Sequence, residues 1–103
     1  MRIKQVTQLT SDSTAVECNS YDGIIETFAL VLDTGETTTF TVNNNKVRRT
    51  STVLITGAYG GGGVPVFNLA AVPTEGSFDV TITNLGADIM DAAAYVEFKV
   101  THN

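Results

Sequence analysis

GSFDVTITN, residues 76–84, decides the fold class, because its apolar and polar side chains alternate without a break. Phe78, Val80 and Ile82 fall on one side of an extended chain, and polar residues stand between them. A period of two is the pattern of a β-strand with one buried and one solvent-facing side. The stretch therefore predicts an antiparallel strand that covers a hydrophobic core.

The same alternation recurs in YVEFKVT at residues 95–101 and in TTTFTV at residues 37–42, where threonines suit a pleated surface. Two segments differ: IIETFALVL at residues 24–32 and TVLIT at residues 52–56 are apolar on both sides. We expect these to be central strands covered on both faces, the first of them by a neighbouring subunit.

Turn-forming clusters separate these segments at the spacing of a β-sandwich. They are SDS (11–13), SYDG (20–23), DTGE (33–36), NNN (43–45), PTEG (73–76) and NLG (84–86). ADIMDAAAY at residues 87–95 has helix-forming composition but is short, so we expect a loop with at most one helical turn. The chain thus predicts an all-β fold of about eight strands, a small antiparallel β-sandwich or jelly roll, as a single domain over residues 1–103.

Composition narrows the classes of function. A chain of 103 residues buries only about 60 to 65% of the surface that it exposes when unfolded, so we expect the isolated domain to be marginally stable. No apolar run approaches the roughly 18 residues of a membrane span, and no signal peptide is visible. Eleven acidic and six basic residues give a net charge of −5, which disfavours nucleic acid as a partner.

The stretch GAYGGGG, residues 57–63, holds five of the nine glycines and suggests a phosphate-binding loop. A Walker loop needs a lysine and a following helix, and a dinucleotide loop needs a βαβ unit, neither of which the sequence provides. We interpret Gly60, Gly61, Gly62 and Gly63 as a mobile connection between strands. An alternative is that this loop orders against a partner, with Tyr59 as an aromatic anchor.

No catalytic site or cofactor is expected. Cys18 is the single cysteine, so it forms no internal disulfide, and we expect it to fill space on a strand. The one histidine, His102, is penultimate, where a preorganised base is improbable. The acidic pairs Asp88 with Asp91 and Glu75 with Asp79 are interpreted as solvated surface. Asp12, Asp22 and Asp33 follow no calcium-loop pattern, and we assign no metal.

The one uneven charge feature is NNNKVRRT, residues 43–50, where Lys46, Arg48 and Arg49 supply half of the positive charge. Most such clusters are solvated turns. The functional alternative is an electrostatic contact for an acidic partner surface.

Taken in order, TQLTSDSTAV, YDGIIET, TTTFTVNNNKV, STVLIT, the glycine stretch before VPVF, EGSFDVTITNLG and AAAYVEFKV resemble a domain of tailed-bacteriophage virion proteins. FTVxN followed by GSFxVxIxN is the most distinctive pair. The resemblance covers essentially the whole chain and points to head decoration (cement) or head-fibre proteins. It implies a jelly-roll-like sandwich, made in the host cytoplasm and bound as a homotrimer, without catalysis, to the major capsid protein on the outer surface of the head.

Two expectations follow about surfaces. A marginal core and an apolar strand would both be relieved if three copies packed Ile25, Ala29 and Val31 around a threefold axis. Lys46, Arg48, Arg49 and residues 59–63 are the candidate contacts with the capsid or another partner. The alternative function is a fibre domain that binds a host glycan or receptor at a shallow site near Tyr21 or Tyr59.

Overall fold

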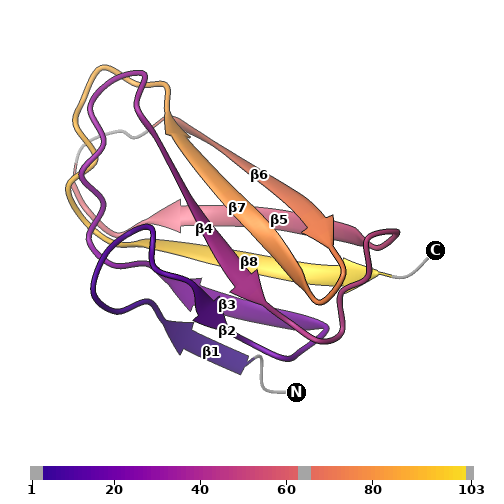
Figure 1. Ribbon diagram of the computed structural model, residues 1–103. Coiled ribbons are helices and arrows are strands. Elements are labelled where there is room, and N and C mark those ends of the chain that lie inside the picture. Colours follow the sequence, from indigo (N-terminus) through magenta and orange to yellow (C-terminus); the bar gives the residue numbers. More distant parts are fainter. Residues whose placement is uncertain (1–3, 63–65, 102–103) are drawn as a thin grey trace.

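The computed structural model describes residues 4–62 and 66–101, which form eight β-strands and no helix (Figure 1). The strands are β1 (Lys4–Thr7), β2 (Val16–Glu17), β3 (Asp22–Glu26), β4 (Thr37–Asn43), β5 (Thr52–Tyr59), β6 (Phe67–Thr74), β7 (Ser77–Asn84) and β8 (Ala94–Thr101). Within those residues no helix is long and apolar enough to cross a membrane. The predicted all-β class and strand number are confirmed.

The strands form two four-stranded sheets, ordered β1-β3-β8-β5 and β2-β4-β7-β6, which pack face to face (Figure 1). Four strand pairs are antiparallel, but β1 pairs with β3 and β2 with β4 in parallel. The predicted antiparallel sandwich therefore holds for four strand pairs, whereas the two pairs at one side of the sandwich are parallel. The reason is connectivity: β1 and β2 belong to opposite sheets, and each reaches its parallel neighbour through a crossing connection rather than a hairpin.

Nearly every connection between the strands crosses from one sheet of the sandwich to the other. Among the strands described, only β6 and β7 are joined as a hairpin, through Glu75 and Gly76. Gly76 has φ 84°, a left-handed conformation that is unfavourable for any residue that carries a Cβ atom. The register of the hairpin sets the inward residues of β7 against those of β6.

The core lies between the sheets and follows the predicted alternation. Phe78, Val80 and Ile82 of β7 are fully buried, as predicted. On β8, Val96, Phe98 and Val100 are buried, whereas the residues between them are exposed. The other buried apolar side chains include Phe40, Val42, Val47, Ile25, Leu30, Leu32 and Met90.

The segment 24–32 differs from its prediction. Its strand, β3, lies between β1 and β8 as a central strand should, but it ends at Glu26. Beyond it, the hydroxyl of Thr27 accepts a hydrogen bond from the Ala94 amide at 2.9 Å, and the Gln8 side chain accepts one from the Phe28 amide at 3.0 Å. Because side chains take these amides, the regular ladder of β3 is interrupted and Phe28 is exposed. Backbone hydrogen bonds from Leu30 to Ala92 and between Leu32 and Met90 then resume the pairing.

The segment 52–56 is also not covered on both faces. It belongs to β5, which continues through Gly57 to Tyr59 at one edge of its sheet. Leu54 points outward with 58% of its side chain exposed, and Ile55 is half-buried. An apolar run without interruptions therefore marked an exposed edge rather than a central strand.

The predictions for residues 87–95 and for Cys18 agree with the structure except in where the strands begin and end. Residues 87–93 form a loop without a helical turn, and β8 begins at Ala94. Cys18 is fully buried among core residues, although it directly follows β2 instead of lying on a strand.

Three buried carboxamides that the sequence pattern did not single out hold the connections in place. Asn84 donates to the carbonyls of Leu32 and Asp88, both at 2.9 Å, and accepts from the Gly86 amide at 2.9 Å. Asn44 donates to the Ser20 carbonyl at 2.7 Å, and Gln8 donates to the Thr14 carbonyl at 2.7 Å. Each amide satisfies backbone groups that a loop leaves unpaired, so the loops are part of the rigid body.

Candidate functional site

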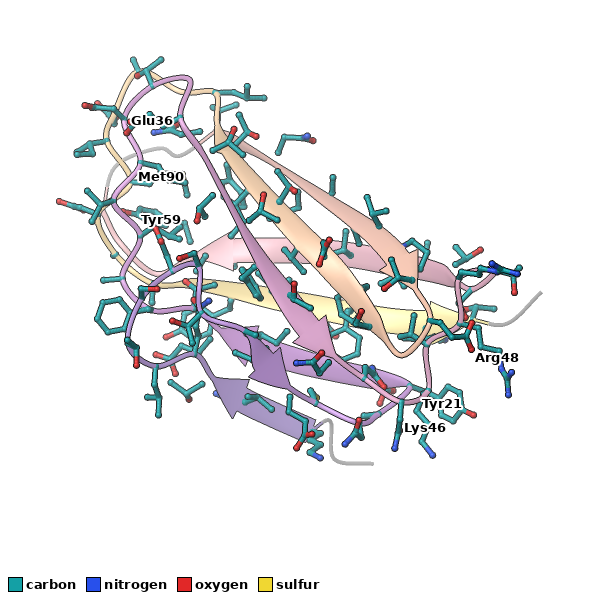
Figure 2. All side chains as sticks on the ribbon, viewed as in Figure 1. Tyr21, Glu36, Lys46, Arg48, Tyr59 and Met90 are labelled. Carbon is teal, nitrogen blue, oxygen red and sulfur yellow. The ribbon has the colours of Figure 1, made fainter. Side chains whose placement is uncertain are left out.

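The predicted basic cluster lies in the connection from β4 to β5, at one end of the sandwich (Figure 2). Its backbone is fixed by side chains: the Lys46 amide donates to Asn44 at 3.0 Å, and the Arg48 amide donates to the Ser51 hydroxyl at 2.9 Å. Lys46, Arg48 and Arg49 are exposed. The Lys46 ammonium lies 5.7 Å from the centre of the Tyr21 ring, a cation–π contact.

Basic residues gather at one end of the long axis, whereas acidic residues lie at both ends. We call the basic end the one at which β3 and β5 begin. It holds the five basic residues of the described chain, Lys4, Lys46, Arg48, Arg49 and Lys99, which outnumber the carboxylates of Asp22 and Glu75 there. The opposite, acidic end holds Asp12, Glu26, Asp33, Glu36, Asp88 and Asp91. Figure 2 shows Lys46 and Arg48 at one end and Glu36 at the other. A partner that approaches along this axis meets two different potentials.

The glycine stretch lies at the acidic end, because β5 runs away from the basic cluster. The Tyr59 hydroxyl accepts from the Asp91 amide at 2.7 Å and donates to the Asp91 carboxylate at 3.2 Å. Gly60 donates to the Ala93 carbonyl at 2.9 Å. The loop is thus tied down where it begins; Gly61 and Gly62 are exposed, and Gly63 lies outside the described residues.

The structure separates the two sets of predicted contact residues. The eight residues of β5 stand between Arg49 and Gly60, and at about 3.3 Å per residue they span roughly 26 Å. The longest dimension of the molecule is 37 Å. A flat partner surface at one end therefore contacts the basic cluster or the glycine stretch, but not both.

The predicted interface between copies needs one correction. Ile25 is fully buried by its own chain in the hydrophobic core, so it has no surface to offer a second copy. It alternates inward on β3, whereas Ala29 and Val31 lie on the exposed segment that follows. Val31 is 71% exposed.

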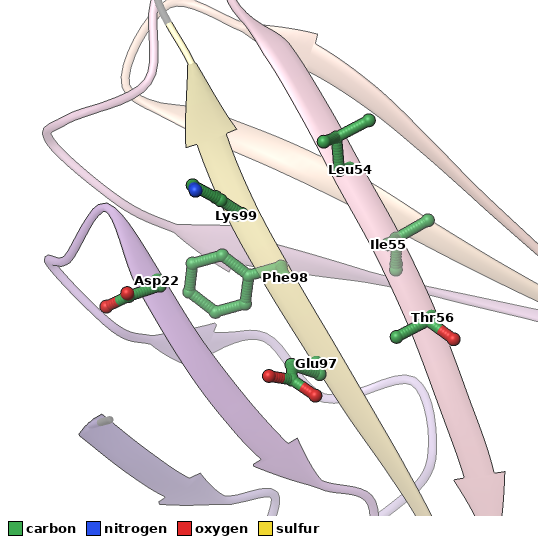
Figure 3. A pocket seen from close by; sticks show the side chains of 7 residues that line it. All are labelled: Asp22, Leu54, Ile55, Thr56, Glu97, Phe98 and Lys99. Carbon is green, nitrogen blue, oxygen red and sulfur yellow. The ribbon is translucent and has the colours of Figure 1, made fainter. Parts of the chain in front are cut away.

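A shallow hollow of about 300 Å³ lies on the outer face of the sheet that contains β3, β8 and β5 (Figure 3). Asp22 lies opposite Lys99 in the register of β3 and β8, and Glu97 lies opposite Thr56. Leu54 provides its apolar wall. These charged groups stand on an exposed sheet face, which suits weak polar contact rather than chemistry in a water-excluded site.

Two of the acidic residues accept hydrogen bonds from neighbouring groups, and the Cys18 thiol is enclosed in the core. Asp79 accepts from the Thr41 hydroxyl at 2.7 Å on the outer face of β7, and Glu75 accepts from the Arg49 amide at 3.4 Å. Burial raises the pKa of the Cys18 thiol, Lys4 lowers it to a smaller extent, and Asp22 raises it. A raised pKa disfavours the nucleophilic thiolate.

Metal ligands are not gathered in the part of the chain that the structure describes, where no three His, Cys, Asp or Glu residues form a possible site. His102 lies outside that part.

The structure has two sheet edges on one side of the sandwich that no sequence motif indicated. β5 and β6 each end their sheet on the same side of the sandwich. The signal that could have found them is a charge gap: residues 50–74, which contain both strands, have no charged side chain.

Comparisons with known proteins do not place the chain in a family. No family model matches the chain, and no curated protein or solved structure is significantly similar to it. The resemblance to tailed-bacteriophage virion proteins therefore stays a prediction from the sequence.

Proposed function

We propose that the protein is a bacteriophage capsid decoration protein, a non-catalytic homotrimer that binds the major capsid protein on the outside of the head and stabilises the shell. The observation that carries the proposal is the placement of all five described basic residues at one end of a rigid sandwich. A small body with one basic end suits docking onto an acidic protein surface in a fixed orientation.

The mechanism is mass action. A ligand that binds the assembled shell but not its separated subunits stabilises the shell by RT ln(1 + [L]/Kd) per site. A trimer that contacts several capsid subunits adds avidity, because the second and third contacts form within one complex. Neither effect needs a reactive group.

The basic end is the docking end in this proposal. The amides of Lys46 and Arg48 are held by Asn44 and Ser51, so the charges project from a fixed connection. Fixed charges lose less conformational freedom on binding than charges on a flexible tail. The acidic end, with the glycine stretch, then faces solvent.

The test mixes purified protein with matching heads and images the particles to measure occupancy. Charge reversal by Arg48→Glu with Arg49→Glu is expected to reduce occupancy, and added salt should weaken wild-type binding. The matched control is Glu36→Lys, a charge reversal at the acidic end that should leave occupancy unchanged. Unchanged occupancy of the arginine double variant removes the basic end from the proposal, and no binding of wild type to heads overturns the function.

The second candidate is a fibre domain that binds a host glycan or receptor. The supporting observation is Tyr21, a residue that is 51% exposed, with the Lys46 ammonium over its ring. Aromatic rings at interfaces provide contact area at low cost in conformational freedom. Binding of the wild type to a glycan array, lost in Tyr21→Ala and kept in Tyr95→Ala, would favour this candidate over decoration.

A further inference from the structure

The two edge strands β5 and β6 form an open side of the sandwich, which we call the seam. They lie against each other at the ends of their sheets. Their inward side chains, Val53, Ile55, Phe67, Leu69 and Ala71, reach the core but are only half-buried. A hollow of about 480 Å³ opens between the strands, lined by Ile55, Thr56, Gly57, Val66, Phe67 and Leu69.

The seam carries none of the usual protection of a sheet edge by charge. All six basic and eleven acidic residues lie outside residues 50–74. The outward positions are also apolar in part, since Leu54 on β5 and Val72 on β6 are each 58% exposed. Proteins normally shield an edge with charges, short strands or proline, because its unpaired backbone groups bind other strands. Here Pro73 interrupts only the end of β6.

The opposite side of the same molecule shows the contrast. Its edge strands β1 and β2 have four and two residues. They carry Lys4 and Glu17, both exposed. That side is short and charged, whereas the seam is formed by two strands of eight residues each. The two edges of one sandwich are thus built differently, and only the seam is suited to pairing.

We propose that the seam is the surface through which copies of this chain bind one another. Identical copies of a protein with net charge −5 repel each other, so their contact is least costly where no charge is brought together. The chain offers one long charge-free strip, and that strip coincides with its free edges. The inference rests on the homotrimer of the proposed function and gives it an interface, with the three seams facing the common axis.

The size of the seam is sufficient for association. A strand of eight residues is about 26 Å long, and packed sheets lie about 10 Å apart. Side chains that point outward from the two sheets add roughly 5 Å on each side, so the strip is about 26 Å by 20 Å, which is roughly 500 Å² per copy or about 1,000 Å² for a pair. That is near the lower bound of a specific interface.

The segment with Ala29 and Val31 is less suitable. It lies at the acidic end, beside Asp33 and in contact with the loop that contains Asp91. Copies joined there would bring carboxylates of the same sign together, which is unfavourable. The seam avoids that repulsion.

The test is the association of the protein alone, measured by sedimentation over a range of concentrations. Leu54→Lys and Val72→Lys place a cation on exposed positions of each edge strand, so the fold should persist, which circular dichroism checks. We expect either variant to weaken association by about tenfold or more. Leu9→Lys, at a position that is 68% exposed and away from the seam, is the matched control and should change nothing.

Val31→Lys decides between the two surfaces. Loss of association in Val31→Lys but not in Leu54→Lys or Val72→Lys overturns the seam and leaves the homotrimer in place. A wild type that stays monomeric at micromolar concentration overturns the seam and the trimer, while binding to heads is measured separately and can still succeed.

A second measurement avoids substitutions altogether. Hydrogen exchange of peptides from β5 and β6 should slow as protein concentration rises, whereas exchange of β1 should not. Equal exchange of β5 at all concentrations, in a protein that associates, overturns the proposal.

Discussion

The ring of Phe78 on β7 packs against the ring of Phe98 on β8 across the two sheets, with centroids 5.0 Å apart and planes inclined at 59°. Tilted aromatic pairs of this kind add to the free energy of burial. Both side chains are essentially buried, and they come from the two strands whose alternation is clearest in the sequence. The contact joins the sheets at the centre of the core.

Phe98→Ala should therefore lower the free energy of unfolding by about 3 to 5 kcal/mol, because it removes buried surface and leaves a cavity. Phe98→Leu keeps more of the volume and should cost less. Urea denaturation of both variants measures the difference. A loss below about 1 kcal/mol for Phe98→Ala would mean that the core does not depend on this pair.

Gly23 on β3 lies under the same ring. A Cβ added there would stand 2.9 Å from Cε1 and Cζ of Phe98 and 3.1 Å from the Cys18 sulfur. Gly23→Ala should cost about 1 to 3 kcal/mol by overpacking. Gly62→Ala is the control, since nothing lies within 4 Å of an added Cβ.

If the ring causes the cost, combining Gly23→Ala with Phe98→Leu should cost less than the sum of the two single changes. Thermal unfolding of the four proteins gives the coupling. Additive costs would locate the strain elsewhere.

The alternation of apolar and polar residues predicted the fold, because successive side chains of a strand point to opposite faces and only one face is buried. Phe78 and Val96 face inward for that reason, and reading the sequence was sufficient to place them. The edge position of β5 could not be predicted in this way, since an apolar run such as residues 52–56 fits a central strand or an unpaired edge equally well. β5 is an edge strand because it pairs only with β8, and that pairing joins residues far apart in the sequence.

The candidate site was predicted only in part. Lys46, Arg48 and Arg49 stand together because they are close in sequence. Their separation from the glycine stretch follows from the direction of β5, and the burial of Ile25 follows from its inward position on β3, which pairs with β1 and β8. Neither is encoded in local spacing.

Asn84 provides a prediction about polar burial. Its side chain is fully buried and makes three hydrogen bonds to the backbone of the loops at the acidic end. Asn84→Leu should lower the free energy of unfolding by about 2 to 4 kcal/mol, since it removes three buried hydrogen bonds, although the Leu32 carbonyl still accepts from the Met90 amide. Asn43→Leu, at an exposed position on β4 and away from the seam, is the control for the substitution itself.

Hydrogen exchange adds a local measurement. Residues 85–89 should exchange faster in Asn84→Leu than in the wild type, because the Gly86 amide loses its acceptor. Unchanged exchange there would show that the loop does not depend on Asn84.

Cys18 gives a prediction about pH. Burial raises the pKa of its thiol in the folded state, so the folded protein holds the proton after the unfolded chain has released it. The unfolded state then binds fewer protons, and stability falls as pH rises above the ordinary thiol pKa of about 8.5. Between the unfolded and folded pKa values the slope from this group is about −1.4 kcal/mol per pH unit. Below pH 8 the thiol should have no effect.

Cys18→Ala isolates that contribution from other groups that titrate at high pH. The wild type should lose more stability than Cys18→Ala between pH 8 and 10, as measured by urea denaturation at each pH. Parallel curves for the two proteins would show that the thiol ionises as easily in the fold as in the unfolded chain. Because the native thiol is enclosed, its reaction with a thiol reagent should also require opening of the sandwich, which slows it about 10³-fold or more for a domain stable by about 5 kcal/mol.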